Sequence, residues 1–360
     1  MATEHKEVSM NDLLKLTMQR NASDLHITMG LPPIIRVNGK LTPTEYPRLM
    51  PEDTKKLIYS ILSDKQKEKF EKSLELDCSH GLKGYGRFRV NVFRQRGSVS
   101  AALRVISQEI PSREELGLPE TVEEILHRPN GLVLVTGPTG MGKSTSIACM
   151  LDMINATTSQ HIITVEDPIE YIHHHKKSMI NQRELGQDTY AWSNALRSAL
   201  REDPDVILVG EMRDLETISY TLTAAETGHL VFSTLHTCDA AQTIDRIIDV
   251  FPPHQQQQIR VQLAAVLVGV FSQQLIPHAN GTGRILALEV LQASSAIKNL
   301  IREGKTYQIY NAIQTSSKDK MQTMEQALYG LYKKNLVTLE DALKATNHPA
   351  EFKHMLDKIN

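Results

Sequence analysis

The sequence predicts an α/β protein with an α+β amino-terminal part, a parallel-sheet nucleotide-binding domain and a helical carboxy-terminal region. Three observations support this prediction. The first hundred residues alternate apolar and polar side chains as antiparallel strands do. From Gly131 onward, short apolar runs (GLVLVT, HIITVE, VILVG, HLVFSTL) alternate with helical segments, which is typical of a parallel sheet with its ligand edge at the strand carboxyl ends. From about Pro277 the pattern becomes mostly helical.

The composition is that of a folded protein without an overall charge bias. Its 360 residues are 41% hydrophobic and 23% charged, which suits two or three domains. The 40 Lys and Arg residues nearly balance the 42 Asp and Glu residues, so no global field favours nucleic acid or anionic lipid. Cys78, Cys149 and Cys238 are odd in number and lack CxxC spacing. This pattern argues against a disulfide framework and against a structural zinc site, and it is typical of a protein from the reducing cytoplasm.

No segment reads as a targeting or membrane-spanning element. The amino terminus MATEHKEVSM has no apolar core, so no signal peptide is expected. The longest apolar run, LAAVLVGVF at 263–271, has about half of the ~20 residues that a spanning helix requires. It is interpreted as a buried helix.

The amino-terminal part contains two predicted hairpins. Asn38-Gly39 separates two extended runs and suits a turn in which both central residues have positive φ. A second hairpin is expected over 87–106, with its turn at 95–98. On its first strand Phe88, Val90 and Val92 share one face, while the other face is basic. The basic face is either an ordinary solvated face or a binding surface, and the sequence leaves both interpretations open. The predicted domains are 1–107, a linker at 108–120 rich in Pro, Gly and charge, and 121–360, with a helical region at 290–360.

The stretch GPTGMGKST carries the strongest chemical signal. It fits the pattern G-x-x-x-x-G-K-[ST] and lies between a predicted strand and a predicted helix, where backbone N–H groups and the helix amino terminus attract phosphate. Lys143 is expected to reach the β- and γ-phosphates, and Ser144 to ligate Mg²⁺. The predicted nucleotide-binding residues of this loop are Gly137, Pro138, Thr139, Gly140, Met141, Gly142, Lys143, Ser144 and Thr145.

Acidic side chains follow two of the other predicted strands. The run DPDVILVGE ends in Glu211, and Gly210 takes the place where Asp is usual, so Glu211 is expected to reach the metal through water and to act as the catalytic carboxylate. The run TVEDPIEY supplies Glu166 and Glu170 as further catalytic candidates, along with Asp167. The alternative is that these acids cap helices or pair with surface lysines.

Two histidines flank the strand in GHLVFSTLHT. His229 and His236 are candidates for contacting a γ-phosphate or relaying its presence, although a structural core histidine gives the same pattern. The run HHHKK at 173–177 lacks a further Cys or His partner at ligand spacing and is interpreted as a polar loop.

With these motifs placed, the chain resembles the secretion ATPase superfamily, and within it the PilT-like retraction ATPases of type IV pili. The similarity runs from SDLHITMGLPPIIRVNGKL through the phosphate loop, TVEDPIEY, LVGEMRD and GHLVFSTLHT to AIKNLIREGKTYQIYNAIQT. The resemblance implies a PAS-like amino-terminal domain joined to a RecA-like ATPase domain, assembled as a homo-hexamer that holds ATP and Mg²⁺ between domains. It also implies that the amino-terminal domain supplies phosphate-binding arginines, for which Arg89, Arg96 and Arg104 are the candidates.

The resemblance further implies a motor that powers pilus retraction and twitching motility. It would act in the cytoplasm at the inner membrane, on a PilC-like platform protein and with an accessory retraction ATPase as a further partner. The segment AIKNLIRE, with Ser295 as its expected cap, resembles the part of the family tied to retraction. Two residues depart from the family pattern: Met141 stands where a small residue is usual, and Lys298 where Arg is usual.

Other functions remain as alternatives. An accessory PilU-like retraction ATPase belongs to the same enzyme class, and an ATP-gated scaffold without useful turnover belongs to another. An extension ATPase is disfavoured because no four-cysteine zinc site and no additional amino-terminal domain is apparent. A GTPase is disfavoured by the lack of an NKxD motif, and a DNA motor by the lack of a basic and aromatic binding surface.

Overall fold

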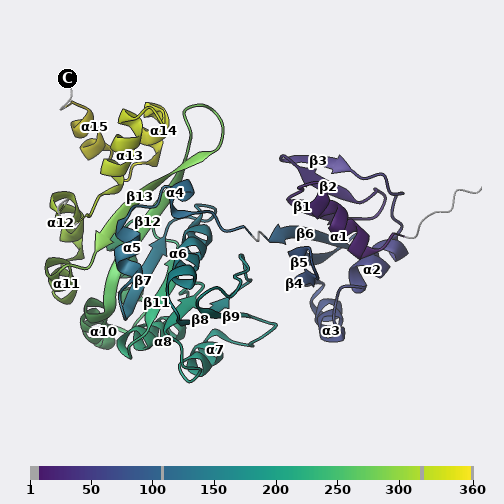
Figure 1. Ribbon diagram of the computed structural model, residues 1–360, viewed down its shortest axis with the longest axis horizontal. Coiled ribbons are helices and arrows are strands. Elements are labelled where there is room, and N and C mark those ends of the chain that lie inside the picture. The colour runs from purple at the N-terminus through teal and green to yellow at the C-terminus, as the bar shows by residue number, and fades with distance from the viewer. Residues whose placement is uncertain (1–7, 107–108, 317–319, 358–360) are drawn as a thin grey trace, which may run out of the picture. The chain divides into compact units, whose positions relative to one another are not determined.

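The computed structural model describes residues 8–106, 109–316 and 320–357, which form two compact units (Figure 1). The first unit runs to Glu109 and includes residues 170–172. The second comprises Ile110–Ile169 and the residues from His173 onward. Each unit has its own sheet and its own buried apolar core, so the predicted α/β class is confirmed.

The first unit is built on an antiparallel six-stranded sheet in the order β3-β2-β1-β6-β5-β4. Both predicted hairpins are present. Asn38 and Gly39 join β2 to β3 with φ angles of 48° and 79°. Arg96 and Gly97 join β5 to β6 with φ angles of 48° and 77°, and these positive values suit the right-handed twist of the strands. The strands are β1 (Asp24–Ile27), β2 (Ile34–Val37), β3 (Lys40–Pro43), β4 (Glu75–Leu82), β5 (Gly86–Gln95) and β6 (Ser98–Ile106).

One face of this sheet is covered by helices. Phe88, Val90 and Val92 are fully buried in a core shared with apolar residues from the helices, as their alternation along β5 predicts. The helices are α1 (Met10–Gln19), α2 (Pro51–Tyr59) and α3 (Asp64–Ser73). Arg89 and Arg104 lie directly opposite each other on β5 and β6 and are exposed, so the other face is polar.

The second unit is built on a seven-stranded sheet in the order β13-β12-β7-β11-β10-β8-β9. Six strands run parallel, and only β13, at one edge of this described sheet, is antiparallel to its neighbour. The carboxyl ends of β7, β8, β10 and β11 therefore meet at one edge of the sheet. The strands are β7 (Gly131–Thr136), β8 (His161–Glu166), β9 (Met179–Glu184), β10 (Val206–Val209), β11 (Leu230–Leu235), β12 (Leu267–Pro277) and β13 (Arg284–Gln292).

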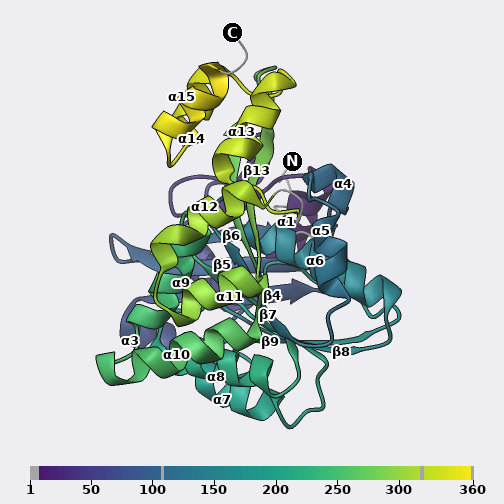
Figure 2. The same ribbon diagram turned by 90° about the vertical axis from the view of Figure 1, so that its left-hand side faces the viewer.

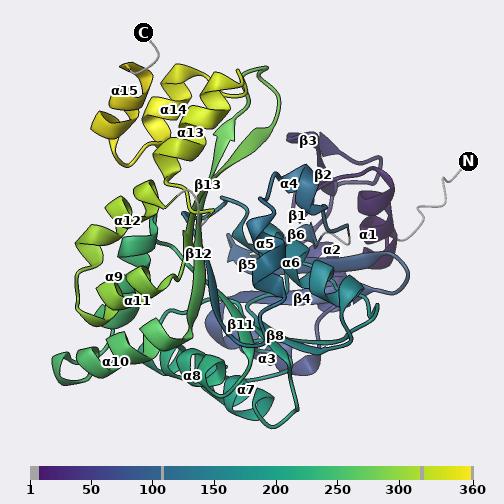
Figure 3. The same cartoon turned by 60° about the vertical axis from the view of Figure 1, so that its left-hand side comes forward.

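Helices cover both faces of this sheet and form two separate apolar cores. In Figure 3, α5 and α6 lie on one side of the strands, and α9, α11 and α12 lie on the other. The helices of this part are α4 (Arg113–Leu116), α5 (Thr121–Leu126), α6 (Lys143–Thr157), α7 (Trp192–Ala199), α8 (Leu215–Glu226), α9 (Ala240–Asp249) and α10 (Pro253–Val266).

The hairpin of β12 and β13 corrects two predictions. The apolar run 263–271 is helical only to Val266, because from Leu267 it pairs with β7 on one side and, from Gly269, with β13 on the other. Residues 290–292 belong to β13, so the helical region begins at Ser295 rather than at 290. An apolar run of this length is compatible with a buried helix and with a buried strand. Here residues 267–271 form a strand because they pair with β7 and β13.

Most of the predicted linker packs on the second unit. Ile110, Leu116 and Leu118 contact the core that contains α5 and α6. Ser112 caps α4 by accepting a hydrogen bond from the N–H of Glu115. Residues 107–108, which include the predicted boundary, lie outside the described residues.

The first of the carboxy-terminal helices, α11, carries most of the segment AIKNLIRE. Ser294, not Ser295, caps α11, because its hydroxyl is the one that accepts from the N–H of Ile297. Thr338 caps α14 by accepting a hydrogen bond from the N–H of Asp341, and α13 packs against β13 (Figure 2). The helices are α11 (Ser295–Arg302), α12 (Ile309–Thr315), α13 (Met324–Lys333), α14 (Leu339–Ala345) and α15 (Pro349–Asp357). Among the described residues, no helix combines the length and apolar character needed to cross a membrane.

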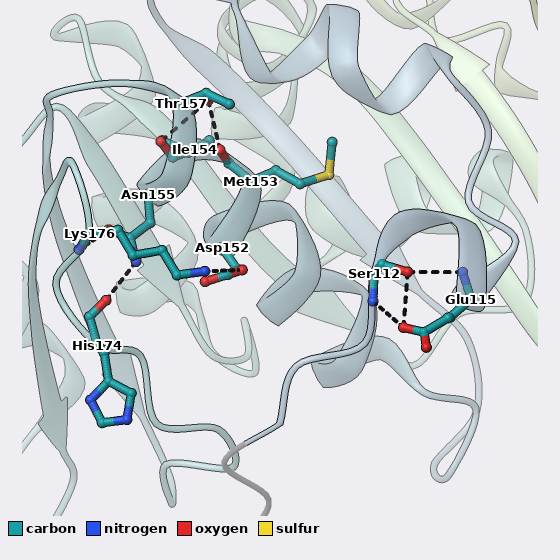
Figure 4. A network of polar contacts seen from close by, with 9 residues as sticks. All are labelled: Ser112, Glu115, Asp152, Met153, Ile154, Asn155, Thr157, His174 and Lys176. Atoms are coloured by element: carbon teal, nitrogen blue, oxygen red, sulfur yellow. Dashed lines mark hydrogen bonds and ion pairs between the residues drawn. The ribbon is translucent and has the colours of Figure 1, made fainter.

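The loop at 173–178 is tied to α6 by a buried amide (Figure 4). Asn155 is fully buried, donates to the carbonyl of His174 at 2.7 Å and accepts from the N–H of Lys176 at 3.0 Å. The ammonium of Lys176 lies 2.7 Å from a carboxylate oxygen of Asp152 on the same helix. The HHHKK run is therefore an ordered polar loop held against the helix that follows the phosphate loop.

Replacing Asn155 by Leu is expected to destabilise the protein by about 1–3 kcal/mol, because the part-buried carbonyl of His174 and N–H of Lys176 lose the buried amide that pairs with them. Chemical denaturation of the purified protein measures this loss. Asp152→Asn is the matched control, because it weakens only an exposed ion pair on the same helix and is expected to cost under about 1 kcal/mol. Equal losses in both variants would contradict the structural role of Asn155.

Candidate functional site

The loop between β7 and α6 has the backbone of a phosphate cradle. Gly137, Gly140 and Gly142 all have positive φ, at 141°, 79° and 79°. A Cβ atom at position 137 would lie 2.4 Å from the carbonyl oxygen of Gln273, so only glycine fits there. The loop leads directly into the 15-residue helix α6, whose free N–H groups and dipole favour an anion at its start.

The β12–β13 hairpin supports this loop from one side. The side-chain amide of Gln273 donates to the carbonyl of Met141 at 2.5 Å, and Arg284 donates to the carbonyl of Gly140 at 3.3 Å. The N–H of Leu275 lies 3.3 Å from the sulfur of Met141, which gives the unusual loop residue a specific contact. No local sequence pattern marks Gln273 or Arg284 as site residues, because both lie on a hairpin whose strands are not predicted from the sequence.

Lys143 is nearly buried and its ammonium is held inside the loop. It donates to the carbonyls of Gly137 at 2.7 Å and Pro138 at 3.0 Å, and it lies 3.3 Å from Nδ1 of His236. Because an ammonium group can only donate, Nδ1 of His236 accepts and the ring proton lies on Nε2. The loop lysine and the histidine after β11 are thus in direct contact.

His236 also contacts Glu211, which follows the neighbouring strand β10. Its Nε2 lies 3.2 Å from one carboxylate oxygen of Glu211, and Arg213 lies 2.8 Å from the other. Partial burial acts to raise the pKa of Glu211, but the hydrogen bond from Arg213 and the nearby His236 outweigh it and lower the pKa below its usual value. Glu211 is therefore an ionised carboxylate at neutral pH.

Gly210 has a packing reason to be glycine. A Cβ atom there would lie 3.2 Å from both the ring of Trp192 and the carbonyl of Val165. The turn after β10 consequently passes close to β8, and Glu211 is the first residue beyond this crowded position.

The other acidic candidates are placed differently. Glu166, at the end of β8, accepts hydrogen bonds from Thr164 at 2.6 Å and Gln182 at 3.2 Å. It lies at the same carboxyl edge of the sheet as Glu211, because β8 and β10 are adjacent and parallel. Glu170 follows the end of β8 by four residues and belongs to residues 170–172, which group with the first unit, so its catalytic role stays a prediction.

His229 requires a correction. It precedes β11, and its Nδ1 lies 2.9 Å from the carbonyl of Ala224 in the turn after α8. The carbonyl of His229 accepts from Gly131 at the start of β7, which is the edge opposite the phosphate loop. The six residues of β11 separate the two histidines at about 3.3 Å per residue, so the structure does not bring His229 to the phosphate loop of its own chain.

The three arginine candidates lie in the first unit. Arg89 pairs with Asp77 at 2.5 Å and Arg104 with Asp24 at 2.9 Å, so the polar face carries both signs of charge. Arg96 is exposed in the turn between β5 and β6.

The residues at the carboxyl edge of the second sheet fit a magnesium nucleotide. The glycine cradle and the start of α6 suit phosphate, and the hydroxyl of Ser144 stands at the second residue of that helix. The carboxylates of Glu166 and Glu211 add hard oxygen ligands of the kind Mg²⁺ prefers, directly or through water. A phosphate loop on a parallel sheet with an acid on a neighbouring strand defines a P-loop nucleotide hydrolase.

Comparison with known proteins gives the family. The model of the family described as Type II/IV secretion system protein matches residues 3–344, and the chain belongs to this family. It is 50% identical to the type IV pilus retraction ATPase PilT of Pseudomonas aeruginosa over 96% of this chain and 100% of that protein. It is 40% identical to the type IV pilus ATPase PilU of the same organism over 96% of this chain and 90% of that protein.

A solved structure matches along almost the whole chain. The crystal structure of the pilus retraction motor PilT with bound ADP has a TM-score of 0.91 and 55% identity, over 97% of this chain and 100% of that one. The predicted relationship to PilT-like secretion ATPases, the ATPase class and the use of a nucleotide are confirmed.

Proposed function

We propose that this protein is a hexameric, Mg²⁺-dependent ATPase motor that powers type IV pilus retraction. The single observation that carries the proposal is the run of contacts from Lys143 through His236 to Glu211, which joins the phosphate loop to an ionised acid at one sheet edge. The similarity to retraction ATPases over the whole of one relative supplies the biological role.

The proposed chemistry is hydrolysis of ATP by an oriented water molecule. When bound, Mg²⁺-ATP supplies the reactive phosphoanhydride and a charge that offsets the nearby carboxylates. The loop 137–145 would hold the phosphates and the hydroxyl of Ser144 would hold the metal, while Glu211 would reach the metal through water and orient the attacking water. Glu166 stands beside it as a second acid.

Lys143 and His236 have a specific part in this scheme. The three donors of the Lys143 ammonium are matched by two loop carbonyls and His236, so a contact to phosphate requires one of them to be exchanged. Exchange of the His236 contact would leave Nδ1 open and alter how Nε2 holds Glu211. Phosphate binding is in this way coupled to the position of the catalytic carboxylate.

The remaining parts of the proposal follow from the family resemblance. Residues 1–107 and 121–360 act as two domains that move relative to each other, and Arg89, Arg96 or Arg104 reach phosphate when they close. An arginine aimed at a phosphoryl transition state is worth about 10³–10⁵ in rate. The motor works on an inner-membrane platform protein from the cytoplasmic side.

The deciding experiment combines two assays. Purified protein is tested for Mg²⁺-dependent phosphate release, and the gene is expressed as the sole retraction ATPase in a strain that lacks its own. Turnover together with restored retraction supports the proposal. If the protein hydrolyses ATP but restores retraction only when a primary motor is also present, it has the accessory role. If it binds ATP without hydrolysing it, it is a scaffold.

A charge reversal on α11 is expected to separate hydrolysis from retraction. Arg302 is exposed at the end of this helix, whereas Leu300 packs partly into the core and would also report folding. Arg302→Glu is expected to keep ATPase activity within about twofold, as surface changes usually do, while retraction fails. Lys333→Glu, in the last turn of α13, is the matched control and is expected to retain both activities. Parallel loss of ATPase and retraction would contradict a partner-binding role for α11.

A further inference from the structure

Glu289 is a buried carboxyl group that the proposed mechanism does not use. It lies on β13, is 3% exposed, and accepts a hydrogen bond at 2.8 Å from the N–H of Ala240, the first residue of α9. The N–H of Met324, the first residue of α13, also interacts with it. One carboxyl group thus joins the starts of two helices.

The loop that Glu289 anchors is the one that carries His236. Four residues, 236–239, connect the end of β11 to the start of α9. The hydroxyls of Thr237 and Thr243 lie 2.6 Å apart, and Asn347 donates to the carbonyl of Cys238 at 3.4 Å, so the loop also contacts its own helix and the carboxy-terminal region. On the other side, Glu289 pairs across the strands with Ser272, whose hydroxyl accepts from Thr136 just before the phosphate loop.

We propose that Glu289 is a positioning residue for His236. By holding the start of α9 it fixes the loop between β11 and α9, and with it the contacts of His236 to Lys143 and Glu211. Through Met324 it ties the same loop to α13, so the carboxy-terminal helices help to set the geometry at the nucleotide site. The inference rests on the proposed ATPase function.

The surroundings of Glu289 are acidic. Burial raises its pKa to about 8, with Asp239 at the start of α9 and Glu325 on α13 adding to the rise, while the N–H groups of Ala240 and Met324 oppose it. Glu325 in turn accepts from Tyr310 on α12 at 3.1 Å and from the N–H of His348 at 3.1 Å. Glu289 is therefore mostly protonated at neutral pH and becomes a buried charge beside two acids as the pH rises past 8.

This titration has a defined direction. The folded-state pKa is raised, so the folded protein holds a proton that the unfolded chain releases at a lower pH. The stability contributed by Glu289 is thus present below the unfolded-state value of about 4.5 and falls as the pH rises through about 8. Glu289→Gln, which keeps a carbonyl acceptor but cannot ionise, removes this dependence.

The test is a double-mutant cycle on the full-length protein with ATPase kinetics as readout. Glu289→Leu removes the acceptor and is expected to lower kcat by about tenfold to 100-fold while KM changes less than about threefold, because a small displacement of a catalytic group affects the rate more than binding. Glu289→Gln is expected to keep kcat within about threefold of the wild type at pH 7. Val337→Ala, a buried apolar change in the carboxy-terminal core, is the control for general destabilisation and is expected to keep kcat within about twofold.

The decisive comparison is made in the His236→Ala background. If Glu289 acts through His236, adding Glu289→Leu lowers kcat by less than about threefold further, whereas additive losses overturn the inference. Should Glu289→Leu not fold, the Gln variant decides. The wild-type kcat is expected to fall above about pH 8 as Glu289 ionises and its hold on the start of α9 changes, and Glu289→Gln is expected to abolish this fall. A wild-type kcat that does not fall, or a Gln variant with the same pH profile as the wild type, overturns the inference. A wild type that binds nucleotide without turnover removes the proposed function and this inference together, while an active wild type with additive losses removes only the inference.

Discussion

Replacing Glu211 by Gln is expected to lower kcat about 10³-fold while ATP binding stays within about threefold, since a positioned general base contributes about 10²–10⁴ to the rate. Glu211 is held by Arg213 on one carboxylate oxygen and by His236 on the other, so its orientation is fixed from two sides. The amide keeps the size of the side chain but cannot accept a proton. Single-turnover phosphate release and binding of a fluorescent ATP analogue separate the two effects.

The control for this variant is Glu226→Gln, an exposed acid on the last turn of α8 whose carboxylate accepts from Gln262. It removes one negative charge from the same unit without touching the nucleotide edge, and kcat is expected to stay within about twofold. A Glu211→Gln enzyme that retains more than about a tenth of the wild-type kcat would mean that another group orients the water, and Glu166 at the end of β8 would then be the candidate.

The lowered pKa of Glu211 also predicts the acid side of the pH profile. The group loses its ionised form only below its usual value of 4.5, so it is not expected to reduce kcat anywhere between about pH 6 and pH 8. Because the folded-state pKa is lowered, the stability that Glu211 contributes is present above the unfolded-state value and is lost as the pH falls through the folded-state value.

Local features of the fold were predictable from the sequence because short-range chemistry determines them. The turn at Asn38-Gly39 and the phosphate loop depend on residues with positive φ at fixed spacing. The carboxylate of Glu211 follows an apolar strand, and parallel strands end at a common edge, so its place at the edge that carries the phosphate loop followed from the strand pattern.

The β12–β13 hairpin was not predictable in the same way. Leu267–Phe271 becomes a strand because places beside β7 and β13 are available, and no local pattern distinguishes this from a helix. Gln273, Arg284 and Glu289 all lie on this hairpin, so their contacts to the phosphate loop and to α9 were missed with it. His229 was misplaced for a different reason: a histidine at each end of one strand marks two edges of a sheet, and only the edge of His236 carries the phosphate loop.

Replacing Lys143 by Ala is expected to weaken ATP binding at least about 100-fold and to abolish turnover. Hydrogen bonds to charged groups contribute about 1.5–3 kcal/mol each, and about 1.4 kcal/mol corresponds to a tenfold change in affinity, so losing two phosphate contacts accounts for this loss. The variant also removes the donor that fixes the ring proton of His236 on Nε2. Isothermal titration with ATP and with ADP measures the loss, which should be larger for ATP because the ammonium reaches the γ-phosphate.

The matched control is Lys176→Ala. This loop lysine pairs with Asp152, which lies on α6, the helix that begins at Lys143. Asp152 lies nine residues beyond Lys143 along α6, roughly 13 Å away at 1.5 Å per residue, so ATP affinity is expected to change less than about twofold. Equal weakening in both variants would mean that the helix responds to general loss of positive charge rather than to a ligand contact.

Lys143→Arg separates the effect of the charge from the effect of the ammonium geometry. The planar guanidinium keeps the positive charge but does not fit the two carbonyls that hold the ammonium inside the loop. ATP binding is therefore expected to fall even though the charge remains. An arginine variant that binds ATP as the wild type does would indicate that charge alone, and not the three-point geometry of the ammonium, determines nucleotide affinity.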